Sequence, residues 1–234
     1  MPTLSLNASQ KTKQTPAGEI PVDWATVRLD AELDIVSGYA FSSEDYTNSD
    51  SDKPLIRGDN VSTGYIDNTE QKHWSGSEDI KATYILQESD ILLAMDRTWI
   101  KHGIRVALVD KKNSGALLVQ RVARLRPNER ELSAFYLAHI RSKRFEDFVK
   151  SGQTEGGGVP HISKKQIAEF PIPLPPLPEQ RKIADILATW DRALATLDQL
   201  IAAKTRRKQA LMQQLLTPPQ GSGQAGKKRL PGFS

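Results

Sequence analysis

The most regular pattern in the chain is an apolar repeat near its C-terminus. Apolar residues there follow one another at alternating steps of four and three positions, a heptad repeat that predicts a long α-helix with a coiled-coil seam. The seam consists of Ile183, Leu187, Trp190, Leu194, Leu197, Ile201, Leu211 and Leu215, and Lys204 and Lys208 interrupt it. Pro178 suits the first helical turn, and Pro218 ends the helix.

A helix of this length needs a partner. At 1.5 Å per residue it would extend for about 60 Å, too far to pack on a small domain along its whole length. We therefore predict self-association through the seam, with an antiparallel homodimer preferred. The alternative is a long helix folded back onto its own domain. The basic segment Lys204–Lys208 is either a solvated face or a contact with DNA or an acidic partner.

Before residue 170, short apolar runs alternate with turn residues, which predicts mixed α/β structure. The expected strands are Ala25–Leu29, Pro54–Arg57, Asp90–Met95, Arg105–Val109 and Ala116–Leu125. The segment Asp110–Gly115 is typical of a hairpin turn, so we expect the last two strands to be antiparallel neighbours.

Helical spacing occurs at two places in the same region. Residues Glu131–Ile140 place apolar side chains on one face, and the helix is expected to extend through Phe145 and Phe148. A short helix is predicted at Ser163–Ala168, because Ser163 and Gln166 have the spacing of a capping box.

The composition changes at Phe170–Pro178, where five prolines favour an extended connection and mark a domain boundary. The predicted fold class is α+β: a mixed α/β domain at residues 18–170, then a proline-rich entry and the long coiled-coil helix at 171–217. Residues 1–17 are expected to be a flexible tail, and residues 218–234, rich in Pro, Gly and Ser, a disordered one.

Charge is distributed unevenly along the 234 residues. The net charge is +4, yet residues 1–95 carry −9, residues 96–170 carry +7 and residues 171–234 carry +6. A concentrated basic region suits nucleic-acid binding, and the alternative is an ordinary bipolar surface. The absence of cysteine excludes disulfides and cysteine-based zinc or redox chemistry. No apolar run is long enough for a membrane helix or a signal core, so the expected compartment is the cytoplasm.

Motifs that would indicate catalysis or phosphate binding are missing. The chain has neither a GxGxxG fingerprint nor a P-loop, and Gly156–Gly158 is expected to be a flexible loop. Its four histidines are too scattered for a local metal site. Asp96 and Asp110 could be combined with Lys111 into a metal-dependent nuclease site, but a turn role for Asp110 is favoured.

The run from Phe170 to Thr217, which contains EQRKIADIL, resembles the conserved region of the DNA specificity (S) subunits of type I restriction-modification systems. Further segments resemble the target recognition domains of that family in the same order: Ile20–Phe41, Pro54–Asp67, Ser89–Thr98, Leu118–Pro127 and Gly158–Pro176. Members usually have two recognition domains and two conserved helical regions. This chain has one of each, and so resembles a half-length subunit.

The resemblance implies a non-catalytic module that binds double-stranded DNA. It implies modification subunits as partners, which bind S-adenosylmethionine and methylate adenine, and restriction subunits that use ATP and Mg²⁺; the chain itself would hold no cofactor. Two copies paired through their helices would read a bipartite palindrome. The alternatives are a self-sufficient Mg²⁺-dependent nuclease using Asp96 and Asp110, or a coiled-coil scaffold that binds protein.

Candidate DNA contacts lie in the loops of the recognition domain, because base reading needs side chains that reach groove edges. The first set follows the strand at Asp90–Met95 and comprises Arg97, Thr98, Trp99 and Lys101, although Trp99 could equally lie in the core. The second set is Arg57 and Asn60, with an ion pair from Arg57 to Asp59 or Asp90 as the alternative. His161, Lys164 and Lys165 lie where a loop enters a helix N-terminus and could contact phosphate, and the alternative is that the lysines are simply solvated. Arg141, Lys143 and Arg144 are also expected to contact phosphate.

Overall fold

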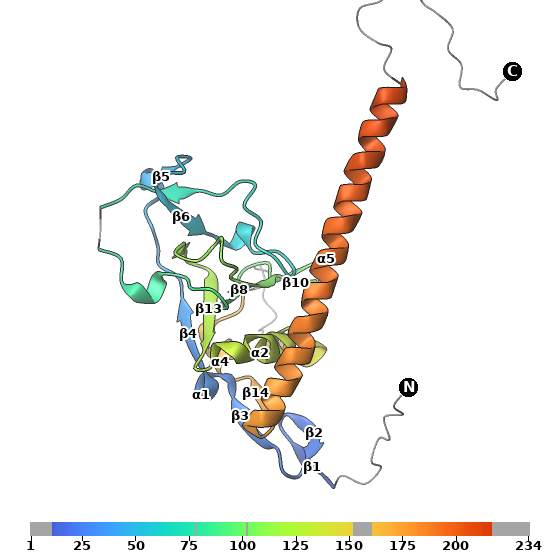
Figure 1. Cartoon of the computed structure of the whole chain (residues 1–234). Helices are drawn as coiled ribbons and strands as arrows, with labels where there is room; N and C mark the ends of the chain where they lie inside the picture. Colours follow the sequence, from blue (N-terminus) through green and yellow to red (C-terminus); the bar gives the residue numbers. More distant parts are fainter. Residues whose placement is uncertain (1–10, 78, 102, 152–160, 217–234) are drawn as a thin grey trace, which may run out of the picture. The chain divides into compact units, whose positions relative to one another are not determined.

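The computed structural model describes residues 11–77, 79–101, 103–151 and 161–216. The chain divides into two compact units, Met1–Ala188 and Thr189–Ser234. The first contains all the strands and the shorter helices (Figure 1). The second consists, in its described part, of the greater length of one helix. The glycine run at 156–158, residues 1–10 and residues 217–234 lie outside the described residues, whereas residues 11–17 of the expected N-terminal tail are described and include a strand at Thr12–Thr15.

Two four-stranded sheets form the framework of the first unit. The central sheet has the order β11 (Val106–Leu108), β8 (Ile91–Ala94), β13 (Val122–Pro127) and β4 (Leu33–Ser37), and its neighbouring strands are antiparallel. The second sheet has the order β12 (Leu117–Leu118), β6 (Lys53–Ile56), β7 (His73–Trp74) and β5 (Tyr46–Thr47), in which β12 and β6 are parallel.

Three two-stranded ribbons complete the strands. They are β1 (Thr12–Thr15) with β2 (Gly18–Pro21), β9 (Trp99–Ile100) with β10 (Gly103–Ile104), and β3 (Ala25–Arg28) with β14 (Pro171–Leu174). The proline-rich run is therefore extended, as predicted, and its first part lies beside β3. Edge pairing of this kind tolerates proline, which has no N–H to donate.

The helices of the first unit are short. They are α1 (Leu29–Glu32), α2 (Ser133–Ile140), α3 (Lys143–Ser151) and α4 (Lys164–Ala168), with 3₁₀ turns η1 (Ser43–Asp45), η2 (Gly58–Asn60), η3 (Ala82–Tyr84) and η4 (Arg130–Leu132). The helix α5 (Leu177–Leu216) has 40 residues and begins in the first unit. Strands, short helices and the long helix together confirm the predicted α+β fold class.

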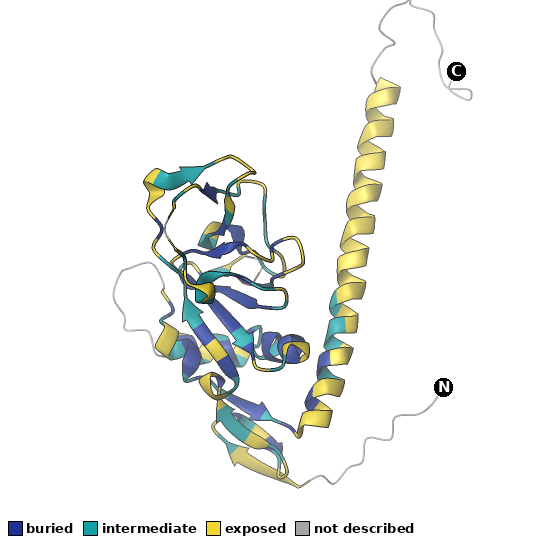
Figure 2. Cartoon of the chain, turned by 60° about the vertical axis from the view of Figure 1, so that its left-hand side comes forward, coloured by how far each residue is buried: buried dark blue, intermediate teal, exposed yellow. Residues whose placement is uncertain are grey.

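The core lies on both faces of β8, whose four residues are all buried (Figure 2). Ile91 and Leu93 pack with the apolar faces of α2 to α4, whereas Leu92 and Ala94 pack with residues of β11 and β12. Because both faces are covered, the strand is a continuous apolar run rather than an alternating one.

The predicted pairing of the strands around Asp110–Gly115 is wrong. Strands β11 and β13 each pair with β8, which lies between them. The strand β8 occupies the inner position between β11 and β13, because it is apolar on both faces. The predicted strand Ala116–Leu125 is also divided, into β12 and β13, around Arg121 at a φ of +67°. Asp110 does form a turn, in which its Oδ1 accepts a hydrogen bond from the N–H of Asn113 at 2.9 Å.

The predicted helix at Glu131–Ile140 is confirmed from Ser133, but its extension through Phe145 and Phe148 is wrong as one continuous helix. The chain turns at Arg141–Ser142, where Ser142 Oγ accepts a hydrogen bond from the N–H of Phe145 at 3.2 Å and α3 begins. The capping box before α4 is confirmed: Ser163 Oγ accepts from the N–H of Gln166 at 3.2 Å, and Gln166 Oε1 accepts from the N–H of Ser163 at 2.9 Å.

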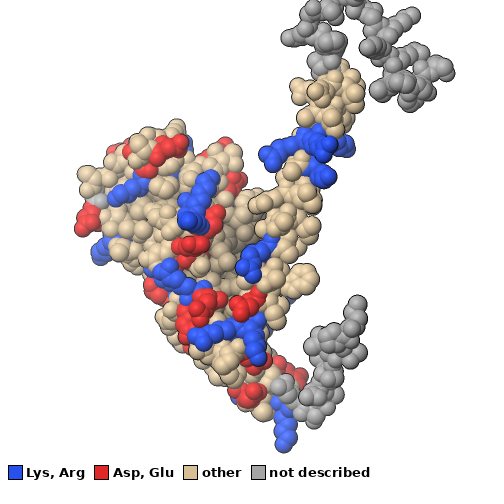
Figure 3. Space-filling model, viewed as in Figure 1, with Lys and Arg blue, Asp and Glu red and all other residues tan. Residues whose placement is uncertain are grey.

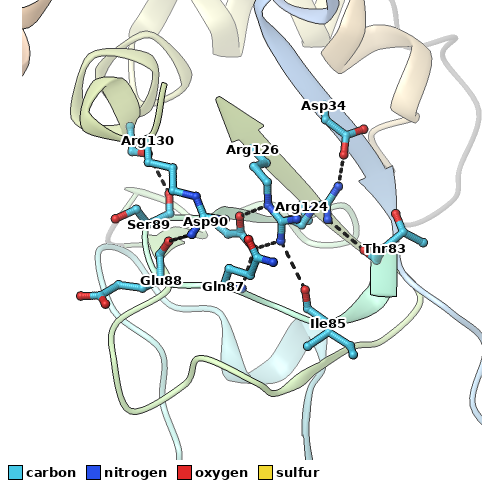
Figure 4. Close-up of polar contacts among 11 residues, drawn as sticks. Asp34, Thr83, Ile85, Gln87, Glu88, Ser89, Asp90, Arg124, Arg126 and Arg130 are labelled. Carbon is cyan, nitrogen blue, oxygen red and sulfur yellow. Dashed lines mark hydrogen bonds and ion pairs between the residues drawn. The ribbon is translucent and has the colours of Figure 1, made fainter. Parts of the chain in front are cut away.

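Two arginines on β13 hold the segment before β8 against the central sheet (Figure 4). Arg126 donates to both oxygens of the buried Asp90 carboxylate at 2.6 and 2.7 Å. Arg124, fully buried, pairs with Asp34 on β4 and donates to the carbonyl of Thr83 at 2.9 Å. Bidentate pairing of this kind fixes geometry as well as charge. The segment that leads into β8 therefore has a defined place on the sheet.

The long helix predicted from the heptad repeat is present, but its seam is not uniform. Within the first unit, Ile183 and Leu187 are half-buried and pack against the core of their own domain. Further along, the seam residues from Trp190 to Leu215 are exposed, from 48% at Leu211 to 69% at Leu215. None of the helices in the described part of the chain combines the length and the apolar composition needed to cross a membrane.

Candidate nucleic-acid interface

A hairpin built on the end of β8 carries the first set of predicted contacts. Thr98 is fully buried, and its Oγ1 donates to the carbonyl of Ala94 at 2.7 Å, which closes the base of the hairpin. The chain then forms β9 and β10, with Ile100 opposite Gly103. Arg97, at a φ of +47°, and Lys101 are exposed. The buried threonine thus fixes a loop from which both cations extend into solvent.

A turn at residues 57–66 carries the second set. Asn60 is buried: its Oδ1 accepts from the N–H of Arg57 at 3.0 Å, and its Nδ2 donates to the carbonyl of Asp67 at 2.9 Å. The tip is closed by a hydrogen bond from the N–H of Ser62 to the carbonyl of Tyr65 at 3.0 Å. Gly64 within this tip has a φ of +91°, which favours glycine. Asn60 therefore shapes the turn rather than pointing into solvent.

The buried Arg105 joins the turn to the hairpin. Its Nε donates to the carbonyl of Val61 at 2.9 Å, and its guanidinium also bonds to the carbonyl of Gly58. Burial lowers the pKa of Arg105, and the carboxylate of Asp59, 3.9 Å away, opposes that shift. The next residue is Val106, the first of β11, and its carbonyl accepts from the N–H of Gly64 at 2.9 Å. We refer to residues 57–66, 96–101 and 103–104 together as the turn–hairpin face.

Contact between the two loops is direct at their tips. A Cβ placed on Gly103 would lie 3.6 Å from Thr63 Cγ2, and one placed on Gly64 would lie 3.4 Å from Arg141 Nη2. The Lys150 ammonium lies 5.3 Å from the centre of the Trp99 ring. Segments far apart in the sequence therefore bring Arg141 and Lys150 next to the turn–hairpin face.

Asp96 organises two further basic side chains at the base of the hairpin. It pairs with the exposed Arg121, and its Oδ1 lies 2.5 Å from His161 Nδ1. Partial desolvation raises the pKa of Asp96, but the hydrogen bonds from Arg121 and His161 outweigh it and hold that pKa below the usual range. A carboxylate held ionised keeps both basic side chains at this edge.

Two predicted site residues have internal partners that compete with DNA. Trp99 is half-buried and packs against the main core, which agrees with the alternative prediction of a core position rather than a DNA contact. Arg144 lies over the Phe170 ring, 4.8 Å from its centre, and bonds to the carbonyl of Pro171. Neither side chain is presented to a ligand as Arg97 and Lys101 are.

The remaining predicted cations lie on helices. Lys143 pairs with Asp147 at 2.6 Å on α3, and Lys165 lies 3.9 Å from Glu169 on α4. Lys164, at the start of α4, is exposed. Such exposed pairs on one helix contribute little energy, so the cations remain available to other anions.

Arg57 does not follow the predicted alternative of a pair with Asp59 or Asp90. Those carboxylates pair with Arg105 and Arg126 respectively. Instead, Arg57 lines a shallow hollow of about 310 Å³ together with Asp59, Asn60, Asp67, Thr69 and Glu70. Three carboxylates in one hollow disfavour phosphate, so the hollow fits a hydrogen-bond donor better than an anion.

Three important basic residues were missed by sequence reasoning. Arg105 and Arg121 lie within or beside apolar strands, where a lone arginine gives no local signal, and Lys150 was one of several cations on a helix. Elsewhere in the chain, Figure 3 shows a basic band on α5, where the sequence has Lys204, Arg206, Arg207 and Lys208.

The arrangement of the acidic residues does not support the nuclease alternative. Asp96 is occupied by Arg121 and His161, and Asp110 is occupied by its own turn. In the part of the chain that the structure describes, no three His, Cys, Asp or Glu side chains come together as possible metal ligands. The face offers cations and hydrogen-bond donors, which suit a polyanion.

Known proteins resemble this chain in sequence. Residues 21–204 match the family described as the type I restriction modification DNA specificity domain. The EcoAI specificity subunit of Escherichia coli is 31% identical over 81% of this chain and 30% of its own length. The putative MjaX specificity subunit of Methanocaldococcus jannaschii is 29% identical over 92% of this chain and 50% of its own length. The chain thus spans half or less of these relatives.

Solved structures share the fold. The HsdS subunit from Thermoanaerobacter tengcongensis superposes with a TM-score of 0.53 at 23% identity, covering 81% of this chain and 42% of that one. A structure from a study of complex assembly and conformational transition of the type I R-M system gives a TM-score of 0.58 at 22% identity, covering 86% and 46% respectively. The two solved chains are thus about twice as long as this one.

Proposed function

Because the chain belongs to the type I restriction modification DNA specificity domain family, we propose that it selects the DNA sequence on which a methyltransferase complex acts. Its role is recognition without catalysis. The single observation that carries this proposal is the turn–hairpin face, where two loops from different parts of the sequence are locked together by Arg105. Preorganised loops suit base reading, because the cost of ordering them is met during folding.

We assign base reading to Arg97 and backbone contacts to the cations around it. Arg97 is exposed at the base of the hairpin, and a guanidinium can bond bidentately to a guanine edge. Lys101, Arg121, Arg141, Lys150 and His161 surround the same loops and suit phosphate. Arg57, beside three carboxylates, is assigned a base-edge contact rather than a phosphate contact. Lys143, Lys164 and Lys165 would add phosphate contacts only if the DNA extends past the hairpin.

The chain is further proposed to act as a pair, which would read a bipartite palindromic site. Support comes from the exposed seam, in which Trp190, Leu194, Leu197 and Ile201 are each more than half exposed. Apolar surface of this extent on a helix is typical of a protein interface. The first two seam residues, Ile183 and Leu187, give less support for a dimer than the exposed ones, because both already pack against their own domain.

A second copy fits the seam better in antiparallel than in parallel orientation. Parallel pairing in register would place Lys204 against Lys204 and Lys208 against Lys208, which is repulsive. An antiparallel pair centred on Gln199 would instead place Lys208 against Trp190 of the partner and Lys204 against Leu194 of the partner. Lysine stems cover apolar surface well, and an ammonium over an indole ring is attractive. The apolar centre would then be Leu197 against Ile201.

The proposed partners follow from the family. Modification subunits would bring S-adenosylmethionine and the methylating active site, and restriction subunits would bring ATP and Mg²⁺. This chain would supply the sequence choice alone, and an antiparallel helix pair would set the distance between the two half-sites.

Mapping of methylated adenines tests the proposal. The genome of a host that expresses the chain with its modification subunits would be compared with the same host lacking the chain. We expect a two-part, symmetrical methylation motif that disappears when the chain is removed. A motif that persists without the chain would refute its role in sequence choice, and an asymmetric motif would refute pairing of identical copies.

A further inference from the structure

The exposed aromatic ring of Tyr65 is not explained by the fold. Its side chain is 59% exposed at the tip of the turn at residues 57–66, and it is the one aromatic residue of the described part of the first unit with more than half of its surface in solvent. Large apolar side chains left in water lose the free energy of burial. A ring held in this position therefore suggests a ligand.

The backbone around Tyr65 is fixed from several sides. The residue after it, Ile66, forms a bridge with Val61 and packs against the second apolar cluster. The residue before it, Gly64, is tied to Val106, and Tyr65 itself accepts the hydrogen bond from Ser62. Because Ile66 is directed inward, the ring of Tyr65 is directed outward. The ring is thus presented by a rigid turn rather than by a loose loop.

The neighbourhood of Tyr65 is both basic and apolar. Arg141 approaches Gly64, and Gly103 of the hairpin lies against Thr63. Opposite Gly103 is Ile100, which is 42% exposed. Two exposed apolar side chains therefore stand on adjacent loop tips, with the cations of the turn–hairpin face around them. In a complex with DNA, the cations would attract the phosphates, and the two apolar side chains would contact the bases between the two backbones.

We propose that Tyr65 enters the DNA as an aromatic wedge and contacts a base step directly. This inference rests on the proposed function and deepens it. Apolar side chains inserted between base pairs partly unstack them, and aromatic rings stack on any base. Trp99 does not fill this role, because it packs against the main core under Lys150. The ring would also ease extrusion of the adenine that a methyltransferase must take out of the helix.

The experiment uses the full chain with its modification subunits and a duplex selected from a random-sequence library by that complex. Each adenine of the site is replaced in turn by 2-aminopurine, whose fluorescence rises when it is unstacked. With the native chain and with Tyr65→Phe we expect a rise at one base step in each half-site, separate from any rise at the adenine that the modification subunits take out of the helix. Tyr65→Ala should abolish the rise at that base step and weaken binding about 5- to 150-fold, the range of aromatic stacking on one base.

The salt dependence distinguishes a wedge from a phosphate contact. Tyr65→Ala should leave the slope of log affinity against log salt unchanged, because no phosphate contact is lost. Val22→Ala is the matched control. It removes another half-exposed apolar side chain, directly after β2 and distant in the sequence, and should change neither the 2-aminopurine fluorescence nor the salt slope.

Three outcomes would overturn the inference. If Tyr65→Ala binds the selected duplex with native affinity and native fluorescence, the wedge is refuted while the proposed function stands. If the variant loses its modification subunits but not DNA, Tyr65 is a protein contact. If the native complex shows no sequence preference, the proposed function fails together with the wedge.

Discussion

The first unit and the exposed part of α5 differ in how their apolar side chains are covered. In the first unit, β8 is buried on both faces, and even charged side chains such as Arg124 and Asp90 have internal partners. In the second unit, Leu194, Leu197 and Ile201 are all more than half exposed. The fold of a single chain accounts for the buried side chains of the first unit, whereas the exposed apolar side chains of α5 need a second chain to cover them.

The largest expected effect concerns the second unit. Replacement of Leu194 and Leu197 by Asp would bury charge in the seam, and should convert a dimer completely to a monomer in light scattering. Ala195→Asp with Gln199→Asp adds the same charge to the same helix outside the seam, and should leave the mass unchanged. A native chain that is monomeric, or a seam variant that stays dimeric, would remove the argument for pairing.

Within the first unit, the largest loss is expected at Asp90. Asp90→Asn breaks the buried bidentate pair with Arg126 and should lower the free energy of unfolding by about 3–5 kcal/mol in a urea titration. Asp30→Asn is the matched control: its pair with Arg28 is exposed, and less than about 1 kcal/mol is expected. Equal losses at the two sites would contradict the view that Asp90 fastens the segment before β8.

A smaller effect should appear as a pH dependence of the stability of the first unit. Burial, assisted by Arg144, lowers the pKa of His139 to about 4, against 6.5 for an ordinary histidine. The unfolded chain therefore binds a proton first as the pH falls, and stability should decrease between about pH 6.5 and pH 4, by up to about 3 kcal/mol.

His139→Phe isolates this contribution. The variant keeps an aromatic ring against Phe135 but cannot titrate. Urea midpoints measured at pH 7 and pH 4.5 should therefore lie closer together for the variant than for the native chain. An identical pH dependence in both would show that His139 does not contribute to it.

The smallest expected effect lies on the turn–hairpin face. Arg97→Ala should cost about 1–3 kcal/mol on the preferred duplex and much less on others, if Arg97 reads a base bidentately. Lys101→Ala should weaken binding to all duplexes alike and reduce the salt slope by about one. A uniform loss for Arg97→Ala would reassign that residue to phosphate.

The sequence predicted those features of the fold that depend on local chemistry. The capping box at Ser163, the long helix from the heptad repeat and the extended proline-rich run are all present. Each depends on residues close together in the chain. The pairing of β11 was missed, because it is decided by β8, an earlier strand with two apolar faces, rather than by the turn at Asp110.

The candidate site could be predicted only in outline. The two loops containing Arg57 and Arg97 were found from their turn residues and charges, but their contact depends on Arg105, a buried arginine between β10 and β11. The aromatic candidate from the sequence was Trp99, with a core position as an equal alternative, whereas the structure exposes Tyr65. Which of two aromatic side chains faces solvent is set by packing between distant segments, and a local pattern does not record it.

Competition binding of the full chain, with its modification subunits, is the most direct test of the central claim that the turn–hairpin face reads DNA sequence. A selected duplex and a scrambled duplex of equal composition would be compared at one salt concentration. We predict a preference of about 10³-fold or more for the selected duplex, sharply reduced by Arg97→Ala. Equal affinities for the two duplexes would contradict the account.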